Sequence, residues 1–403
     1  MAHISANIEP VRTISVPRQC ADGVARALAR GKGVLLLGPR QTGKTTLLAG
    51  VEAALRLDLT SPQVRQRYER QPQLLQGEVE ALSARRRSPV VVLDEVQKVP
   101  ALLDVAQTLM DRKVARVVLS GSSARKLRRG AHANLLPGRV VSIRLDPLML
   151  REESTRPLES RLLYGDLPGF VLSGDDRDRE IDLASYVTTY LEEEVRAEAL
   201  VRNLASFSRF LELAAAEAGR IINRRALSQD VGVAHTTIAD YYQILEDCLI
   251  VERIDPLTTS ATRKKLTRSP KILFFDLGVR RLAAGEGRRP TRERLGEWFE
   301  QWVGQELVRL TRDRSARHPV RFWRDPDGPE VDWVLDLEGR LIPIECKWAE
   351  APAAADARHL RTFLDEHPTA TRAFIVCRTP RRFAVAPRVE AVPWQELPEL
   401  VTR

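Results

Sequence analysis

The pattern of apolar and polar positions along this chain changes twice, and the changes predict three regions. Between residues 31 and 150, short runs rich in β-branched residues alternate with helix-compatible stretches, which is typical of a parallel α/β sheet. Residues 156–255 are almost entirely helical in pattern, and residues 290–380 return to mixed helix and strand. We therefore expect an α/β fold with three domains, at residues 1–155, 156–288 and 289–403.

Five buried strands are predicted in the first region, because each is a short, mainly apolar run. They are Val34–Leu37, Arg56–Leu59, Val90–Leu93, Arg116–Leu119 and Val140–Leu145. In a parallel α/β sheet, ligands bind beyond the carboxyl ends of the strands. Polar residues that directly follow these runs are therefore candidates for a shared site.

A glycine-rich segment follows the first predicted strand and fits the spacing G-x-x-x-x-G-K-[S/T] at every fixed position. Its glycines allow backbone N–H groups to face phosphate oxygens, and the helix that follows adds partial positive charge at its start. We expect Lys44 to reach the β- and γ-phosphates and Thr45 to coordinate Mg²⁺, with a helix over Thr46–Leu55. The predicted contacts to the nucleotide are Gly38, Pro39, Arg40, Gln41, Thr42, Gly43, Lys44, Thr45 and Thr46.

Acidic and polar residues follow two further strands. The third predicted strand ends in Asp94 and Glu95, and the fourth ends in Ser120. We expect Asp94 to hold Mg²⁺ through water, Glu95 to polarise the attacking water, and Ser120 to lie beside the γ-phosphate. Taken alone, each group could be an ordinary solvated turn, but the complete phosphate-binding segment upstream favours a site.

Together these segments resemble a family of prokaryotic AAA+-type ATPases in which the P-loop domain is joined to a C-terminal domain of unknown function. The matching segments extend over most of the chain: GPRQTGKT, VVLDEVQ, LSGSS, Gly138–Arg139, Tyr186–Glu194, Lys271–Gly278, Gly296–Leu307, Glu330–Asp332 and Ile344–Lys347. The resemblance implies ATP and Mg²⁺ as cofactors and ATP hydrolysis as an activity. It also implies that Arg139 is an arginine finger for a neighbouring subunit's site, and hence a homo-oligomer; a plain surface arginine is the alternative.

Residues 224–251 have the pattern of a helix-turn-helix, as in a winged helix. Leu227 and Val231 share one face of the first helix, and a turn at Gly232 leads to a second helix over 235–248. In a DNA reader the N-terminal residues of the second helix enter the major groove, and here these are His235, Thr236 and Thr237. That helix contains acidic residues and no lysine or arginine, which is poor for phosphate binding. DNA binding and a structural or partner-docking role both remain open.

The third region predicts the order helix, three strands, helix, strand. Glu345 and Lys347 are two residues apart on one strand face, and Asp332 lies on the other strand of a hairpin that turns at Glu338–Gly339. This arrangement resembles the PD-(D/E)XK nuclease core, and Glu300 matches an acidic position on its first helix. The resemblance implies that Asp332 and Glu345 hold Mg²⁺ and that Lys347 positions the nucleophile or offsets transition-state charge. The alternatives are charges on an exposed hairpin face, or a related fold that binds without cleaving.

Composition adds a partner and a compartment to this picture. The net charge is +9, which favours a polyanionic partner such as nucleic acid, although 54 of the 63 cationic residues are arginine and this skew can reflect coding bias. The four cysteines are scattered without a C-x-x-C pair, which argues against a zinc site and fits a reducing compartment. No apolar run approaches the roughly 20 residues of a membrane span. We therefore expect a cytoplasmic protein without a membrane segment.

Two classes of function follow from these motifs. The first is an ATP-driven enzyme whose nuclease-like module is directed at DNA or RNA. The second is a nucleotide-switched regulator or scaffold whose C-terminal module binds DNA or a protein partner without cleavage. A DNA-binding transcription factor is a third possibility, weakened by the acidic second helix.

Overall fold

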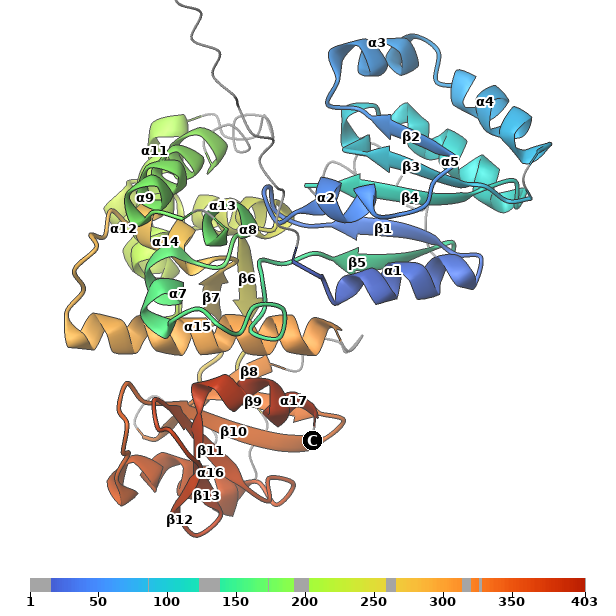
Figure 1. The fold of residues 1–403 in the computed structure, drawn as a ribbon. Coiled ribbons are helices and arrows are strands. Elements are labelled where there is room, and N and C mark those ends of the chain that lie inside the picture. Colours follow the sequence, from blue (N-terminus) through green and yellow to red (C-terminus); the bar gives the residue numbers. More distant parts are fainter. Residues whose placement is uncertain are drawn as a thin grey trace, which may run out of the picture.

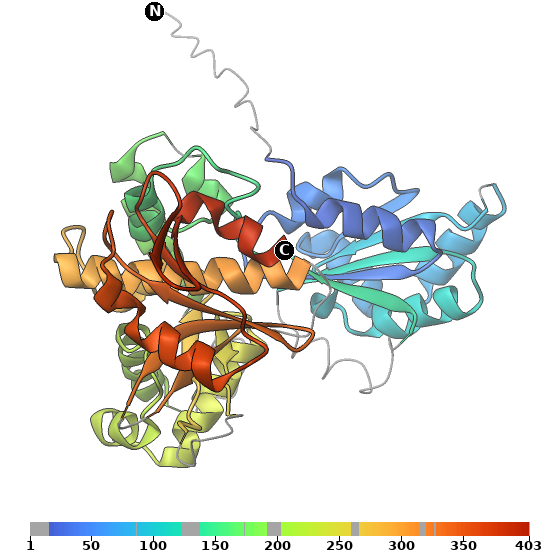
Figure 2. The same ribbon diagram turned by 90° about the horizontal axis from the view of Figure 1, so that it is seen from below.

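The computed structural model of the chain describes residues 16–85, 87–122, 138–172, 174–191, 203–258, 266–313, 320–325 and 328–402. An N-terminal α/β unit lies beside a helical middle region, and the long helix α15 (Arg292–Asp313) separates the middle region from a C-terminal sheet (Figure 1). The view from below shows the C-terminal sheet lying across α15 (Figure 2). Residues 192–194, part of one segment that resembles the ATPase family, lie outside the described ranges.

The N-terminal unit is built on a five-stranded sheet in the order β2-β3-β4-β1-β5, and every pair in it is parallel. Its strands confirm the five predicted ones with ends shifted by one or two residues: β1 (Gly33–Leu37), β2 (Leu55–Asp58), β3 (Val90–Asp94), β4 (Arg116–Gly121) and β5 (Val140–Arg144). The helical elements are α1 (Cys20–Ala29), α2 (Lys44–Ala49), α3 (Pro62–Arg70), α4 (Leu74–Ser83), η1 (Val96–Lys98) and α5 (Ala101–Asp111).

Alternating residues of the central strands feed two hydrophobic cores, one on each face of the sheet. On β3, Val91 and Leu93 pack with residues of α5, whereas Val92 packs with residues of α1 and α2. Such strands read as continuous apolar runs because both faces are covered. The helix expected over Thr46–Leu55 was wrong in its extent: α2 ends at Ala49, since Leu55 already pairs with Val91 in the sheet.

The middle region is helical, as expected, and carries one two-stranded sheet. Its helical elements are α7 (Leu158–Tyr164), α8 (Pro168–Val171), α9 (Asp176–Tyr186), η2 (Val187–Leu191), α11 (Leu204–Ala216), α12 (Arg224–Val231), α13 (His235–Asp247) and α14 (Leu277–Ala283). Gly232 ends α12 with a φ of 72°, a left-handed conformation that glycine adopts without strain. After α13 the chain forms an antiparallel pair, β6 (Val251–Ile254) and β7 (Lys271–Phe274).

The C-terminal sheet has six strands in the order β12-β13-β11-β10-β9-β8. They are β8 (Val320–Arg324), β9 (Glu330–Leu337), β10 (Arg340–Cys346), β11 (Ala373–Cys377), β12 (Phe383–Ala386) and β13 (Val389–Pro393). The helical elements after α15 are η3 (Ala354–Ala357), α16 (Arg358–Glu366), η4 (Trp394–Glu396) and α17 (Leu397–Thr402). The hairpin β9–β10 turns at Glu338 and Gly339, as predicted, and both residues have positive φ, which suits the twist of a two-residue turn.

The middle region and the C-terminal sheet share one hydrophobic core around α15. Leu162 and Leu277 from the middle region belong to the same buried cluster as Trp302 of α15 and Trp333 of β9. Helix and sheet approach closely at Gly304, where a side-chain Cβ would lie 2.5 Å from an atom of the Trp333 ring. The two parts therefore form one packed body rather than two units on a loose linker. Within the described ranges, no helix is both long and apolar enough to span a bilayer.

Candidate functional site

The loop between β1 and α2 has the conformation of a phosphate cradle. Gly43 caps α2 with a φ of 94°, and Gln41 also has a positive φ of 62°. A Cβ at Gly38 would collide with the carbonyl oxygen of Leu145, so only glycine fits there. The hydroxyl of Thr42 donates to the carbonyl of Pro39 at 2.9 Å and holds the turn closed. The loop thus presents the N-terminus of α2 at the carboxyl edge of the sheet, where an anion is stabilised.

Lys44 lies buried across this loop. Its Nζ donates to the carbonyl oxygens of Gly38 and Pro39 at 2.9 and 3.0 Å, and lies 3.7 Å from Oε1 of Glu95. The charge is therefore held between the loop and the tip of β3. The contact of Lys44 with a bound phosphate stays a prediction.

Four predicted site residues meet at the tips of β3 and β4. The hydroxyl of Thr45 donates to Oδ2 of Asp94 at 2.8 Å, and the hydroxyl of Ser120 donates to Oδ1 of the same carboxylate. The backbone N–H of Glu95 donates to the Ser120 hydroxyl at 3.0 Å. Hydroxyl and carboxylate oxygens are the ligands that Mg²⁺ prefers, so Thr45 and Asp94 fit that ion.

The carboxylate of Glu95 is oriented by two side chains to which the sequence analysis gave no role. Gln97 donates its amide N–H to Oε2 of Glu95, and the Ser122 hydroxyl donates to the same oxygen at 3.3 Å. Glu95 itself has a φ of 55°, an unusual conformation for a non-glycine residue. Strained conformations of this kind cluster at functional sites. The position of Gln97 inside the segment VVLDEVQ was the available signal.

Two residues from outside the loop hold its backbone. Arg18 donates through Nη1 to the carbonyl of Thr42 at 2.7 Å, and through Nε to Oε2 of Glu152 at 3.0 Å. Tyr186, the last residue of α9, donates its hydroxyl to the carbonyl of Arg40 at 3.2 Å. The phosphate-binding loop is thereby tied to the segment after β5 and to the middle region. No local motif marks Arg18, because its partners lie far away along the chain.

Arg139 lies at the opposite edge of the sheet from the phosphate cradle. It directly precedes β5, whose first residue pairs with Gly33 at the start of β1. Its guanidinium donates from Nε and Nη2 to both carboxylate oxygens of Asp111, the second at 3.2 Å, and lowers the pKa of that carboxyl. Arg139 therefore does not reach the nucleotide site of its own chain, and its role as an arginine finger stays a prediction.

The C-terminal residues Asp332, Glu345 and Lys347 lie together, beside Glu300 of α15. Lys347 Nζ donates to Oε1 of Glu345 at 2.8 Å, and the backbone N–H of Cys346 donates to Oδ2 of Asp332 at 2.8 Å. Burial and the charges of Glu300 and Glu345 raise the pKa of Asp332 well above its usual range. Burial also raises the pKa of Glu345, against the opposing charge of Lys347.

Glu345 is buried rather than on an exposed hairpin face, with an exposed fraction of only 6%. α16 packs on the face of the sheet opposite α15, so both faces of the sheet are covered. The Oε2 atom of Glu345 is buried without a hydrogen-bond partner among the described residues. This orphaned oxygen, close to a second carboxylate, suits a hard divalent cation that takes its remaining ligands from water or phosphate. In the described ranges, no three His, Cys, Asp or Glu side chains form a metal cluster by themselves.

Lys271 was missed as a site residue by sequence reasoning. Its Nζ donates to Oε1 of Glu300 at 2.8 Å and lies 5.0 Å from the centre of the Trp333 ring. Burial opposes its charge, but Glu300 and Asp332 outweigh burial and raise the pKa of Lys271. The ion pair joins Lys271, the first residue of β7, to Glu300 of α15, and Asp332 of β9 also acts on Lys271 through its charge.

Comparison with known proteins gives the chain a family. It is 31% identical over 388 residues to the uncharacterized protein Rv2008c of Mycobacterium tuberculosis and to the uncharacterized protein Mb2031c of Mycobacterium bovis, covering 94% of this chain and 84% of each relative. The chain belongs to the family of these mycobacterial proteins. Within this family member, residues 30–153 match an AAA domain, residues 155–289 a domain of unknown function (DUF8612), and residues 295–397 a second domain of unknown function (DUF4143).

A crystal structure of protein VC1899 from Vibrio cholerae aligns with 92% of this chain and 96% of its own, at 13% identity. Its TM-score of 0.21 is too low to carry an argument about fold or function. The AAA match, together with the parallel sheet and the phosphate cradle, makes the N-terminal part of this family member an ATPase-like P-loop domain.

Proposed function

We propose that this protein binds ATP with Mg²⁺ and hydrolyses it, and that hydrolysis drives a nuclease-like C-terminal module directed at nucleic acid. The observation that supports this most strongly is the hydrogen-bonded group of Thr45, Asp94, Ser120 and Glu95 facing Lys44 across the phosphate cradle. All five residues come from the carboxyl edge of one parallel sheet. In open α/β sheets, ligands bind outside that edge.

In this proposal each residue has one task. The backbone N–H groups of the cradle and Lys44 bind the phosphates, and Thr45 and Asp94 hold Mg²⁺, which when bound neutralises charge on the phosphate oxygens. Glu95, oriented by Gln97 and Ser122, positions the attacking water. Ser120 fixes the backbone of Glu95 and so couples the two carboxylates.

Arg139 completes the site of a neighbouring subunit, which makes the active form a homo-oligomer. Its distance from the cradle of its own chain and its partial exposure, 34% for the side chain, support this role. The ion pair with Asp111 is exposed and therefore weak, so it can be exchanged for a contact to phosphate.

The same proposal treats residues 1–155, 156–288 and 289–403 as an ATPase domain, a helical and winged-helix domain, and a PD-(D/E)XK-like domain. The three matched ranges support the division. The order of α12, α13 and the β6–β7 pair supports the winged helix, and the order of α15, three strands, α16 and β11 supports the nuclease-like core. Asp332 and Glu345 would hold the metal there, with Lys347 offsetting charge on the scissile phosphate.

Coupling between the parts is supported by ion pairs that cross their borders. Arg144 on β5 pairs with Glu252 on β6, and Arg312 on α15 pairs with both Glu252 and Asp146. Together with the hydroxyl contact from Tyr186 to the cradle, they give a packed route from the nucleotide to the C-terminal module.

Two assays on the full-length protein test the proposal. The first measures phosphate release from ATP for wild type, Lys44→Ala and Glu95→Gln; we expect both variants to lose turnover. The second measures cleavage of DNA and RNA with Mg²⁺ or Mn²⁺, with and without ATP, for wild type, Asp332→Asn and Lys347→Met. Arg361→Met, an exposed arginine on α16, is the control for loss of a cation.

We expect wild type to cleave nucleic acid. Asp332→Asn and Lys347→Met should abolish cleavage while their ATP turnover stays intact. Absence of ATP binding would overturn the whole proposal. Intact ATP turnover with no cleavage of any nucleic acid would favour the second class of function, a nucleotide-switched scaffold whose C-terminal module only binds.

A further inference from the structure

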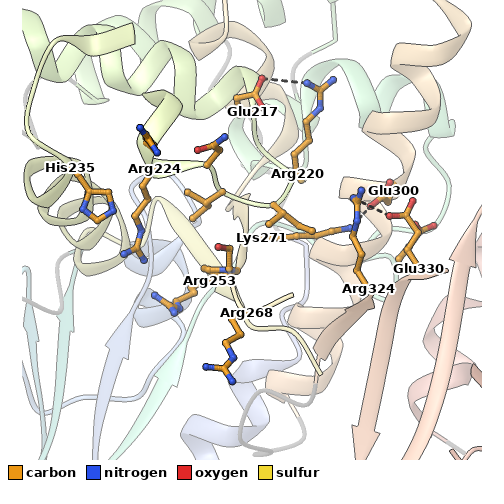
Figure 3. A pocket seen from close by; sticks show the side chains of 18 residues that line it. Glu217, Arg220, Arg224, His235, Arg253, Arg268, Lys271, Glu300, Arg324 and Glu330 are labelled. Carbon is orange, nitrogen blue, oxygen red and sulfur yellow. Dashed lines mark hydrogen bonds and ion pairs between the residues drawn. The ribbon is translucent and has the colours of Figure 1, made fainter. Parts of the chain in front are cut away.

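A polar cleft of about 980 Å³ lies between the middle region and the C-terminal sheet. Its walls come from α12, the start of α13, β6, the start of β7, α15 and the β8–β9 hairpin. Figure 3 shows His235 and Arg224 on one side of this cleft, with Glu300 and Glu330 on the opposite side. Asp332 and Glu300 therefore line the same cleft as His235, the first residue of α13.

The cleft is strongly basic. Among the residues that the structure describes, seven arginine and lysine side chains line it against four carboxyls. Four of the cations are paired with acids, among them Lys271 with Glu300 and Arg324 with Glu330 at 3.1 Å. The other three, Arg224, Arg225 and Arg268, have no hydrogen-bond or ion-pair partner among the described residues. Unpaired cations that line one cleft raise the local concentration of anions.

The lining also restricts the kind of anion. Apart from His235, no described residue that lines the cleft has an aromatic ring on which an isolated base could stack. Much of the cation surface is open to water, since the side chains of Arg220, Arg253 and Arg324 keep 52, 42 and 46% of their exposure. Enclosed pockets suit small ligands, whereas an open cationic groove without stacking rings suits a regular array of phosphates.

We infer that this cleft binds a nucleic-acid duplex through its phosphate backbone, along a path from the start of α13 to the carboxylates at Asp332 and Glu300. The inference rests on the proposed function for the direction of the path, toward a nuclease-like centre. The contacts are made without regard to base sequence, because backbone contacts position a duplex but do not read it. The middle region thus acts as a guide for substrate rather than as a sequence reader.

α13 itself has no lysine or arginine. The cations come from neighbouring elements instead: Arg224 and Arg225 from α12, Arg253 from β6, and Arg268 from the segment before β7. Figure 3 shows Arg224 beside the exposed His235 at the N-terminus of α13, with Arg253 and Arg268 farther along the cleft. Acidic residues farther along α13 do not line the cleft.

The test measures binding of a fluorescent duplex of random sequence to the full-length protein in EDTA, which prevents cleavage, over a series of salt concentrations. The variant carries Arg224→Ser, Arg225→Ser and Arg268→Ser. The matched control carries Arg26→Ser, Arg30→Ser and Arg70→Ser, three exposed arginines of the N-terminal unit that have no partner among the described residues. A third protein replaces the three cleft arginines by lysine, which keeps their charge.

Each phosphate contact contributes about −0.9 to the slope of log K against log salt for a duplex. We expect the cleft variant to reduce that slope by about 2 to 3, the control to leave it unchanged, and the lysine protein to restore most of it. Equal slopes for the cleft variant and the control would overturn the inference. So would tighter binding of poly-glutamate than of duplex, because the occupant would then be an acidic protein.

The outcome is separable from that of the proposed function. ATP turnover by the cleft variant should equal that of wild type, because none of the three arginines lies near the phosphate cradle. Loss of duplex binding with intact ATP turnover supports the cleft assignment. Intact cleavage and intact duplex binding in the cleft variant would sink the cleft assignment while leaving the proposed enzyme standing.

Discussion

Four charged side chains meet where the N-terminal unit, the middle region and α15 come together. Arg144 contacts Asp146 at 3.0 Å and also binds Glu252, and Arg312 binds the same two acids, with Nη2 3.0 Å from Oε1 of Glu252. All four side chains are at most 16% exposed. We predict that Arg312→Met destabilises the protein strongly, because two buried carboxylates are then left facing one guanidinium.

The size of the effect can be estimated in two ways. Breaking a buried pair by removing one partner costs about 3–5 kcal/mol. Burial tends to raise the pKa of Asp146, but the charges of Arg312 and then Arg144 outweigh it and lower that pKa from 3.8 to about 2. A shift of this size corresponds to about 2–3 kcal/mol of stability, present above pH 4 and lost as the pH falls toward 2. We therefore expect a loss of about 2–4 kcal/mol at neutral pH.

Urea unfolding followed by tryptophan fluorescence measures this loss where it occurs. All six tryptophans lie between residues 298 and 394, so the signal reports on α15 and the C-terminal sheet. With a slope of about 2 kcal/mol per M, the transition should move down by about 1–2 M urea. Adding Glu252→Gln to Arg312→Met removes the excess negative charge beside Arg144 and should recover part of the loss.

The control is Arg292→Met, an exposed arginine at the start of the same helix with no partner among the described residues. Equal midpoints for Arg312→Met and Arg292→Met would refute the reasoning, because the four-charge group would then contribute nothing to stability.

Three further predictions concern other parts of the molecule. Glu95→Gln should keep ATP affinity, measured by fluorescent-nucleotide displacement, and lower the hydrolysis rate at least about a hundredfold, because an amide cannot act as the base for water; unchanged turnover would remove Glu95 from the mechanism. Burial and the charge of Asp166 raise the pKa of Asp276 from 3.8 to about 6, so ionisation of Asp276 should cost about 2 kcal/mol of stability as the pH rises from 4 to 6, and Asp276→Asn should remove that contribution in urea titrations at each pH. Gly304→Val should lower the free energy of unfolding, measured by tryptophan fluorescence in urea, by about 1–3 kcal/mol, since its side chain meets the Trp333 ring, whereas Gly77→Val on α4, with nothing near its Cβ, should not perturb that core.

The parts of the fold that depend on local pattern were predicted well from the sequence. The five strands of the N-terminal sheet are apolar runs because helices cover both faces, and their ends were correct to within two residues. The cradle was recognisable because Gly38 and Gly43 are required by contacts and backbone angles inside one short segment. The late strands β12 and β13 were not foreseen, since strands of four and five residues carry little periodic signal.

Contacts between distant segments escaped prediction. Glu345 could have been an exposed hairpin charge, and only the packing of α16 on the sheet makes it buried. Nothing near Arg18 in the sequence indicates that it holds the carbonyl of Thr42. The absence of lysine and arginine from α13 argued against DNA binding by that helix. The sequence did not show that arginines of neighbouring elements line the same cleft.

The sequence alone determined that a phosphate cradle, one acidic strand tip and one polar strand tip exist, because glycine conformation, strand burial and motif spacing act over a few residues. Only the tertiary structure decided that Lys271 pairs with Glu300 and that arginines of α12 and of the segment before β7 line one cleft. The physical reason is that electrostatic environments are sums over neighbours in space, and these neighbours are brought together by the shared core around α15.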